Sequence, residues 1–78
     1  MNAKDVQRDH KRLFDNLMLI QKTYNVKALS ELLGIKPNTW TNRMKEPWKY
    51  FSYDDFKLLA RYCKVDFITL MEGELKLR

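Results

Sequence analysis

Two amides and one hydroxyl in the middle of the chain have the types and the spacing needed to recognise base pairs. They are Asn38, Thr41 and Asn42. Residues three and four positions apart share one face of an α-helix, so on a helix these side chains point the same way. An Asn amide can pair with N6 and N7 of adenine, and a Thr methyl can contact the methyl group of thymine. We therefore expect these residues to read bases in the major groove of double-stranded DNA.

Basic residues surround this segment and could neutralise phosphates. Residues 26–50 contain five Lys or Arg and two Glu, and so carry +3 of the net charge of +5. Phosphate contacts set affinity and register without selecting a sequence. Arg43 flanks the polar face, so it could instead pair with Glu46 or pack its stem over the core. We expect phosphate contacts from Lys27, Lys36, Arg43, Lys45 and Lys49.

The helix that carries the polar face must bury its opposite side. Successive residues of an α-helix lie about 100° apart, which places Trp40 and Met44 opposite Asn38 and Asn42. We expect Trp40 and Met44 to be core residues. Pro37 suits the first helical turn, where a missing amide donor costs nothing. The sequence predicts a helix over 37–45, ended by Pro47.

A shorter helix, over 27–33, is predicted just before it. Its apolar residues are Leu29, Leu32 and Leu33. Gly34 suits the position just beyond a helix end, where the backbone is often left-handed, and Ile35 can fill the corner that follows. The two helices and this corner predict a helix-turn-helix at about 27–45.

The rest of the chain predicts three further helices. One spans 5–22, and its apolar stripe comprises Val6, Leu13, Phe14, Leu17 and Met18, with Gln21 at the edge. A loop at 47–51 follows the helix-turn-helix. Ser52 and Asp55 form a capping box for a helix over 53–63, and Asp66 caps another over 67–72. We therefore predict an all-α, compact five-helix domain over residues 1–78, with flexible ends at 1–4 and 74–78.

One continuous pattern runs from Thr23 to Gly73. It comprises Leu29-Ser30, Leu33-Gly34-Ile35, Asn38-Thr39-Trp40-Thr41, Pro47, Phe51, Leu58-Leu59-Ala60, Val65 and Leu70-Met71-Glu72-Gly73. This pattern resembles the phage lambda-repressor-like family, the Cro and repressor type that includes many small prophage regulators. The resemblance implies a five-helix fold, binding as a dimer to a roughly palindromic operator, and control of transcription.

The remaining chemistry-bearing residues favour a binding protein over an enzyme. No Gly-rich phosphate loop and no nucleophile motif is present. His10 has no second ligand at metal-site spacing, and Cys63 lies on the apolar stripe of its helix. Asp54 and Asp55 are expected to serve a helix start. We expect no catalytic residue, no metal, no cofactor and no small-molecule ligand.

Cysteine content and hydropathy bear on the compartment. The single cysteine excludes an intramolecular disulfide and suggests a reducing environment. No signal-peptide pattern is present, and no apolar run approaches the roughly 18 residues of a membrane span. We expect a cytoplasmic transcriptional regulator, most readily a repressor, that binds its DNA operator as a homodimer and has no contact with a membrane.

An alternative is a helical protein-interaction module, such as an antitoxin or an anti-repressor partner. Its surface would use Trp48, Tyr50 and the alternating Leu75 and Leu77 of the tail. Trp48 and Tyr50 could equally cover the 47–51 loop, touch the DNA backbone or face a second subunit. The dimer contact is also open: the 67–72 helix, the tail and the N-terminal segment are all possible surfaces.

Overall fold

The computed structural model describes the backbone of residues 3–77 and the side chains of residues 7–77. This part of the chain contains helices and no strand, which confirms the all-α prediction. Its radius of gyration of 11.9 Å is near the roughly 11.5 Å expected for a compact chain of this length. The helices are α1 Ala3–Thr23, α2 Val26–Leu33, α3 Pro37–Arg43, α4 Pro47–Tyr50, α5 Tyr53–Cys63 and α6 Phe67–Glu72.

The predicted count of five helices is wrong, because 47–51 is not a loop. Pro47 opens the short helix α4, in which the N–H of Tyr50 bonds to the Glu46 carbonyl at 3.1 Å and that of Phe51 to the Pro47 carbonyl at 3.1 Å. A four-residue helix is too short for an apolar period. A proline is compatible both with the end of one helix and with the first turn of the next. The sequence pattern could not separate these two cases.

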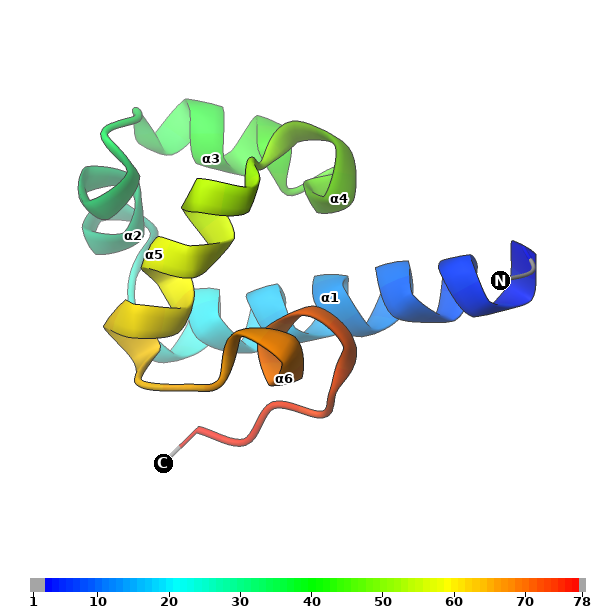
Figure 1. Ribbon diagram of the computed structural model, residues 1–78. Coiled ribbons are helices and arrows are strands. Elements are labelled where there is room, and N and C mark those ends of the chain that lie inside the picture. The colour runs from blue at the N-terminus through cyan, green and yellow to red at the C-terminus, as the bar shows by residue number, and fades with distance from the viewer. Residues whose placement is uncertain (1–2, 78) are drawn as a thin grey trace.

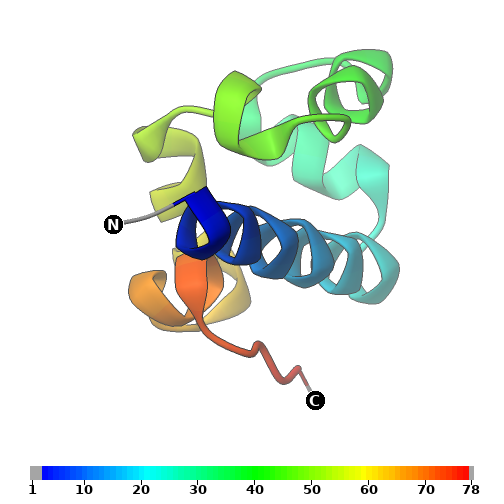
Figure 2. The same ribbon diagram turned by 90° about the vertical axis from the view of Figure 1, so that its right-hand side faces the viewer.

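The helices form two layers joined by α2 and α5. Figure 1 shows α3 and α4 along one side of the molecule and α1 with α6 along the other. Figure 2, which looks towards the N-terminal end of α1, shows α1 between the α3–α4 layer and α6. The centre of the core is fully buried and draws on five helices: Leu17, Ile20, Leu29, Trp40, Leu59 and Leu70.

The buried side of α1 differs in part from the predicted stripe. Leu13 and Leu17 are buried as predicted, but Met18 is 42% exposed and Ile20 is fully buried. The prediction for Val6 falls outside the described side chains. The stripe is displaced because the polar residue Asn16 is buried together with its apolar neighbours, being only 6% exposed. A prediction from apolar periodicity places every amide on the solvent side of a helix, so it could not place Asn16 on the buried side of α1.

Asn16 joins α1 to the C-terminal end of the chain. Its Nδ2 donates to the carbonyls of Leu70 and Gly73, both at 2.9 Å, and more distantly to that of Thr69 at 3.3 Å. Its Oδ1 accepts a bond from the N–H of Leu75 at 3.2 Å. One amide thus satisfies the backbone where α6 ends and the tail begins. The Leu75 side chain is buried in the hydrophobic core.

The predicted caps are confirmed. Ser52 Oγ accepts from the Asp55 N–H at 3.1 Å, and Asp55 Oδ2 accepts from the Ser52 N–H at 2.9 Å, which is a reciprocal capping box. Asp66 Oδ2 accepts from the Thr69 N–H at 3.2 Å and begins α6. Gly73 ends α6 for reasons of space: a Cβ there would lie 3.0 Å from the Thr69 Cα.

Candidate nucleic-acid interface

A sharp corner between α2 and α3 sets the direction of α3. Gly34 has φ +70° and ψ 31°, the left-handed conformation predicted for it. The Ile35 N–H returns to the Ser30 carbonyl at 2.9 Å and closes the end of α2. Lys36 is extended and α3 starts at Pro37, as predicted. At its other end α2 is capped by Asn25, whose Oδ1 accepts from the Ala28 N–H at 2.7 Å.

The inward side of α3 is fixed by an indole. Trp40 is fully buried and Met44 is 6% exposed, so the prediction that both are core residues is confirmed. The indole Nε1 donates to Gln21 Oε1 at 2.7 Å, and the ring lies 5.1 Å from the Phe51 ring. Apolar packing and one hydrogen bond therefore set the rotation of α3 relative to α1.

The outward side of α3 is polar and exposed. Asn38, Thr41 and Asn42 are all exposed, as is Lys45. Within the described part of the chain, the side chains of these first three residues make no hydrogen bond to another protein group. Their donors and acceptors are therefore available to a ligand. The helix is two residues shorter than predicted: α3 ends at Arg43, and Lys45 lies in the turn that follows.

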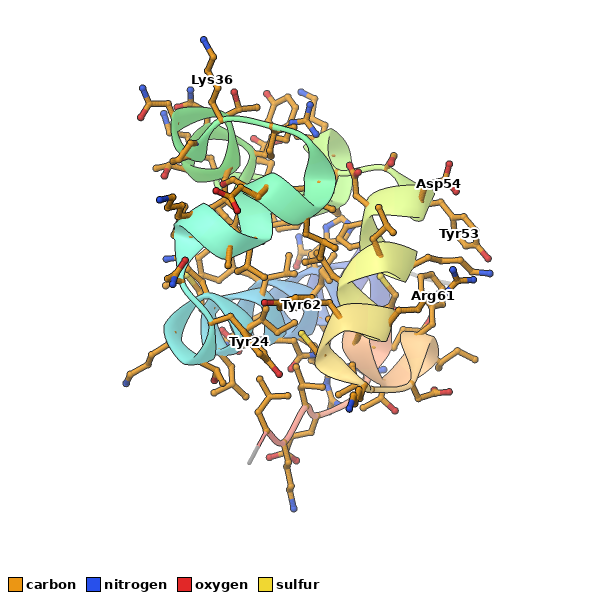
Figure 3. All side chains as sticks on the ribbon, turned by 90° about the vertical axis from the view of Figure 1, so that its left-hand side faces the viewer. Tyr24, Lys36, Tyr53, Asp54, Arg61 and Tyr62 are labelled. Atoms are coloured by element: carbon orange, nitrogen blue, oxygen red, sulfur yellow. The ribbon has the colours of Figure 1, made fainter. Side chains whose placement is uncertain are left out.

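Four of the five predicted phosphate-binding residues are exposed. Lys27 lies in the first turn of α2, and Lys36 projects away from the body of the molecule beside the corner (Figure 3). Lys45 is exposed in the turn after α3. Lys49 is also exposed, although its Nζ lies 3.9 Å from Glu46 Oε2 and 5.4 Å from the centre of the Tyr50 ring. These positive charges lie on α2, at the corner, after α3 and on α4.

Arg43 differs from the lysines because it is held by the protein itself. Its Nη1 lies 3.4 Å from Asp55 Oδ2, and its Cζ lies 5.9 Å from the centre of the Phe51 ring. Its side chain is only 32% exposed. The predicted alternative of pairing with Glu46 is wrong, since the partner is Asp55. The same carboxylate caps α5, so Arg43 links α3 to the start of α5.

An open pocket adjoins the outward face at the C-terminal end of α3. Its volume is about 360 Å³, and it is lined by Thr39, Asn42, Arg43, Lys45, Glu46 and Tyr50. Tyr50 is 49% exposed. The ring of Tyr50 on α4 therefore lies beside the polar residues of α3. The predicted loop at 47–51 would not have fixed the position of this ring.

Trp48 packs against α1. Its ring is stacked on that of His10, with the centroids 4.3 Å apart and the planes 4° from parallel. Trp48 nevertheless keeps 38% of its surface exposed. The sequence carries no signal for this pair, because the two residues are far apart along the chain and no local pattern relates them.

The described residues were also compared with the requirements of a reactive thiol, a metal site and a membrane-spanning helix. Cys63 is buried, and burial raises the pKa of its thiol, so the thiol is protonated and unreactive near neutral pH. Among the described residues no group of three or more His, Cys, Asp or Glu side chains could hold a metal ion. Over the same residues, every helix is too short or too polar to cross a membrane.

The tail is not the open surface that the protein-interaction alternative requires. Leu75 is buried and Leu77 is partly buried against the core. No strand forms from their alternation in the described range. Leu75 instead belongs to the contact that Asn16 makes with the end of α6.

Comparison of the chain with family models, with curated proteins and with solved structures finds no match. The resemblance to the lambda-repressor-like family therefore stays a prediction from the sequence pattern. The side chains around α3, through their charge and exposure, are the features of the molecule that indicate a function.

Proposed function

We propose that the protein is a sequence-specific DNA-binding transcriptional regulator of the small phage or prophage type, most readily a repressor acting in the cytoplasm. One observation carries the proposal: α3 is held by a buried Trp40 while its opposite face exposes Asn38, Thr41 and Asn42 without protein partners. Unpaired amides on a rigid helix are suited to bidentate hydrogen bonds with base edges. In this proposal α2, the corner and α3 act as a helix-turn-helix.

The lysines around α3 supply the electrostatic part of binding. Lys27, Lys36, Lys45 and Lys49 are exposed and would contact phosphates on either side of the groove. Arg43 acts mainly by fixing α3 to α5, because its guanidinium already has Asp55 as a partner. Base preference would therefore come from the two amides and the hydroxyl, and affinity from the lysines.

The protein would bind its operator as a homodimer. Two copies would place α3 in successive major grooves, with half-site centres roughly 34 Å apart. Ile68 of α6 supports α6 as the dimer contact, because its 66% exposure is the largest among the exposed large apolar and aromatic side chains of the described residues. The N-terminal end of α1 projects beyond the other helices (Figure 1) and is the other surface to consider.

Selection of bound sequences from a random pool of duplex DNA tests the proposal. We expect enrichment of one motif with approximate twofold symmetry, and a gel shift that survives competitor DNA at moderate salt. Failure to enrich any motif, together with complexes lost on adding competitor, would refute sequence-specific binding. That outcome would favour the alternative of a protein-interaction module that uses Trp48 and Tyr50.

A further inference from the structure

Three cations lie along the outer side of α5, away from the α3 face. Lys57, Arg61 and Lys64 follow one another at helical steps of four and three residues, and all three are exposed. Tyr53 lies one turn before them, 60% exposed, with Lys57 Nζ 5.1 Å from the centre of its ring. Figure 3 shows Tyr53 and Arg61 projecting from the same side of α5.

These cations surround a pocket at the junction of α5 and α6, which we call the α5–α6 pocket. Its volume is about 290 Å³, and its apolar lining comes from Ala60, Val65 and Phe67. The ring of Phe67 packs edge-on against that of Tyr53, with centroids 5.2 Å apart. The pocket therefore combines a basic rim with an apolar floor.

The cations that line the pocket outnumber its carboxylates by three to one. No ion pair in the described part of the chain joins Lys57, Arg61 or Lys64 to a carboxylate. Asp66 also lines the pocket, but its carboxylate is engaged as the N-cap of α6, accepting from the Thr69 N–H at 3.2 Å. The three cations thus meet solvent next to apolar surface.

The backbone at Lys64 is a second, independent observation. Lys64 has φ 57° and ψ 44°, and it is the one non-glycine residue with positive φ in the described range. Glycine is the favoured residue at this position after a helix, because any Cβ is strained in the left-handed region. A lysine here keeps a positive charge on the rim at a conformational cost. Non-glycine residues held in this region are found disproportionately at functional sites.

We propose that the α5–α6 pocket docks an acidic segment of a partner protein that carries an aromatic or aliphatic residue among its carboxylates. The carboxylates would pair with Lys57, Arg61 and Lys64, and the apolar side chain would cover Val65 and Phe67. A nucleic-acid backbone would satisfy the cations but leave the apolar floor in water. The junction of α5 and α6 lies away from α3 (Figure 1), so the proposal does not depend on DNA binding.

A peptide-binding experiment with the full chain tests this. The probe is a fluorescein-labelled peptide of glutamate, phenylalanine and leucine, called the mixed peptide. Its binding is compared with that of an all-glutamate peptide of equal length and of a labelled random-sequence DNA duplex. By fluorescence anisotropy, we expect Arg61→Glu to weaken binding of the mixed peptide by about tenfold. The matched control Lys76→Glu changes an exposed cation outside the pocket and should alter binding by less than about twofold.

Lys64→Gly separates the site from folding defects. Glycine relieves the left-handed backbone, so the melting temperature should rise or stay unchanged, while affinity for the mixed peptide should fall several-fold with the lost charge. Amide resonances of Val65 and Phe67 should shift when the peptide is added. Affinity unchanged in Lys64→Gly would overturn the role of the three-cation rim.

The remaining outcomes also decide the proposal. Equal affinity for the mixed and the all-glutamate peptide would remove the apolar floor from recognition. If Arg61→Glu and Lys76→Glu weaken peptide binding equally, binding depends only on the net charge of the protein. Loss of duplex DNA binding in Arg61→Glu, without loss of peptide binding, would assign the surface to nucleic acid. Each of these three results contradicts the proposed site.

Discussion

Asn16 and Ser30 are both polar and both buried, being 6% and 1% exposed, yet their surroundings differ. Asn16, at the α1–α6 junction, uses its amide on four backbone groups around the end of α6. Ser30, in α2 near the corner, has a buried Oγ with no hydrogen-bond partner in the described residues. One junction depends on a satisfied polar contact, whereas the other packs around a hydroxyl that contributes no bond.

The two regions are also built over different distances in the sequence. The Asn16 contacts bridge 53 to 59 residues, whereas the corner after α2 is closed by bonds within five residues. The corner therefore closes through backbone hydrogen bonds alone, and the amides of Asn38 and Asn42 on α3 stay exposed. The same functional group is structural at Asn16 and is left for a ligand on α3.

The largest effect is expected at the α1–α6 junction. Asn16→Leu keeps the number and branching of the side-chain heavy atoms but leaves the Leu75 N–H and the carbonyls of Leu70 and Gly73 without this partner. Because each buried unsatisfied group costs about 1–3 kcal/mol, we expect the free energy of unfolding to fall by about 3 kcal/mol. Urea denaturation measures it. A loss below about 1 kcal/mol would show that water replaces the amide.

On α3 the same type of residue should behave in the opposite way. Asn42→Ala should weaken binding to the selected operator by about 1–3 kcal/mol, because a bidentate contact with a base is lost. Stability and affinity for random DNA should be nearly unchanged, since the side chain is exposed. Titration of both DNAs by anisotropy checks this. Equal losses on operator and random DNA would exclude Asn42 from base reading.

Removal of the buried Ser30 hydroxyl in α2 is expected to increase stability. Ser30→Ala removes a desolvated group that has no partner and introduces a better helix former, so stability should rise by about 1 kcal/mol. Ser52→Ala is the matched control: it deletes a hydroxyl that caps α5 and should cost about 1 kcal/mol. The two variants are compared by thermal and urea unfolding. A decrease in Ser30→Ala would mean that Oγ has a partner, such as a bound water.

The smallest expected effects are on the salt dependence of operator binding, where Arg43 should differ from the lysines. Lys45→Ala should lower the salt slope of operator binding by about one, as expected for one lost phosphate contact. Arg43→Gln should lower that slope less and reduce stability by about 0.5–1 kcal/mol, because its partner is Asp55. Binding measured over a range of salt concentrations gives both slopes. An unchanged slope in Lys45→Ala would remove Lys45 from the phosphate contacts.

The predictions that are confirmed depend on neighbours along the chain. The left-handed Gly34, the Ser52–Asp55 capping box and the burial of Trp40 all follow from residues within one or two helical turns. The prediction failed at α4, which is too short for a period, and at Met18, where the apolar pattern misplaced the buried side of α1. Whether α3 reads DNA stays a prediction.

The sequence by itself determined the helices other than α4, the caps at Ser52 and Asp66, the corner before α3 and which side of α3 carries the amides. These features depend on backbone chemistry and on residues three or four positions apart, which periodicity records. Only the tertiary structure decided the partners across distant segments: Asn16 with the end of α6, His10 with Trp48 and Arg43 with Asp55. Such contacts depend on how the helices pack against one another, and no local pattern specifies that packing.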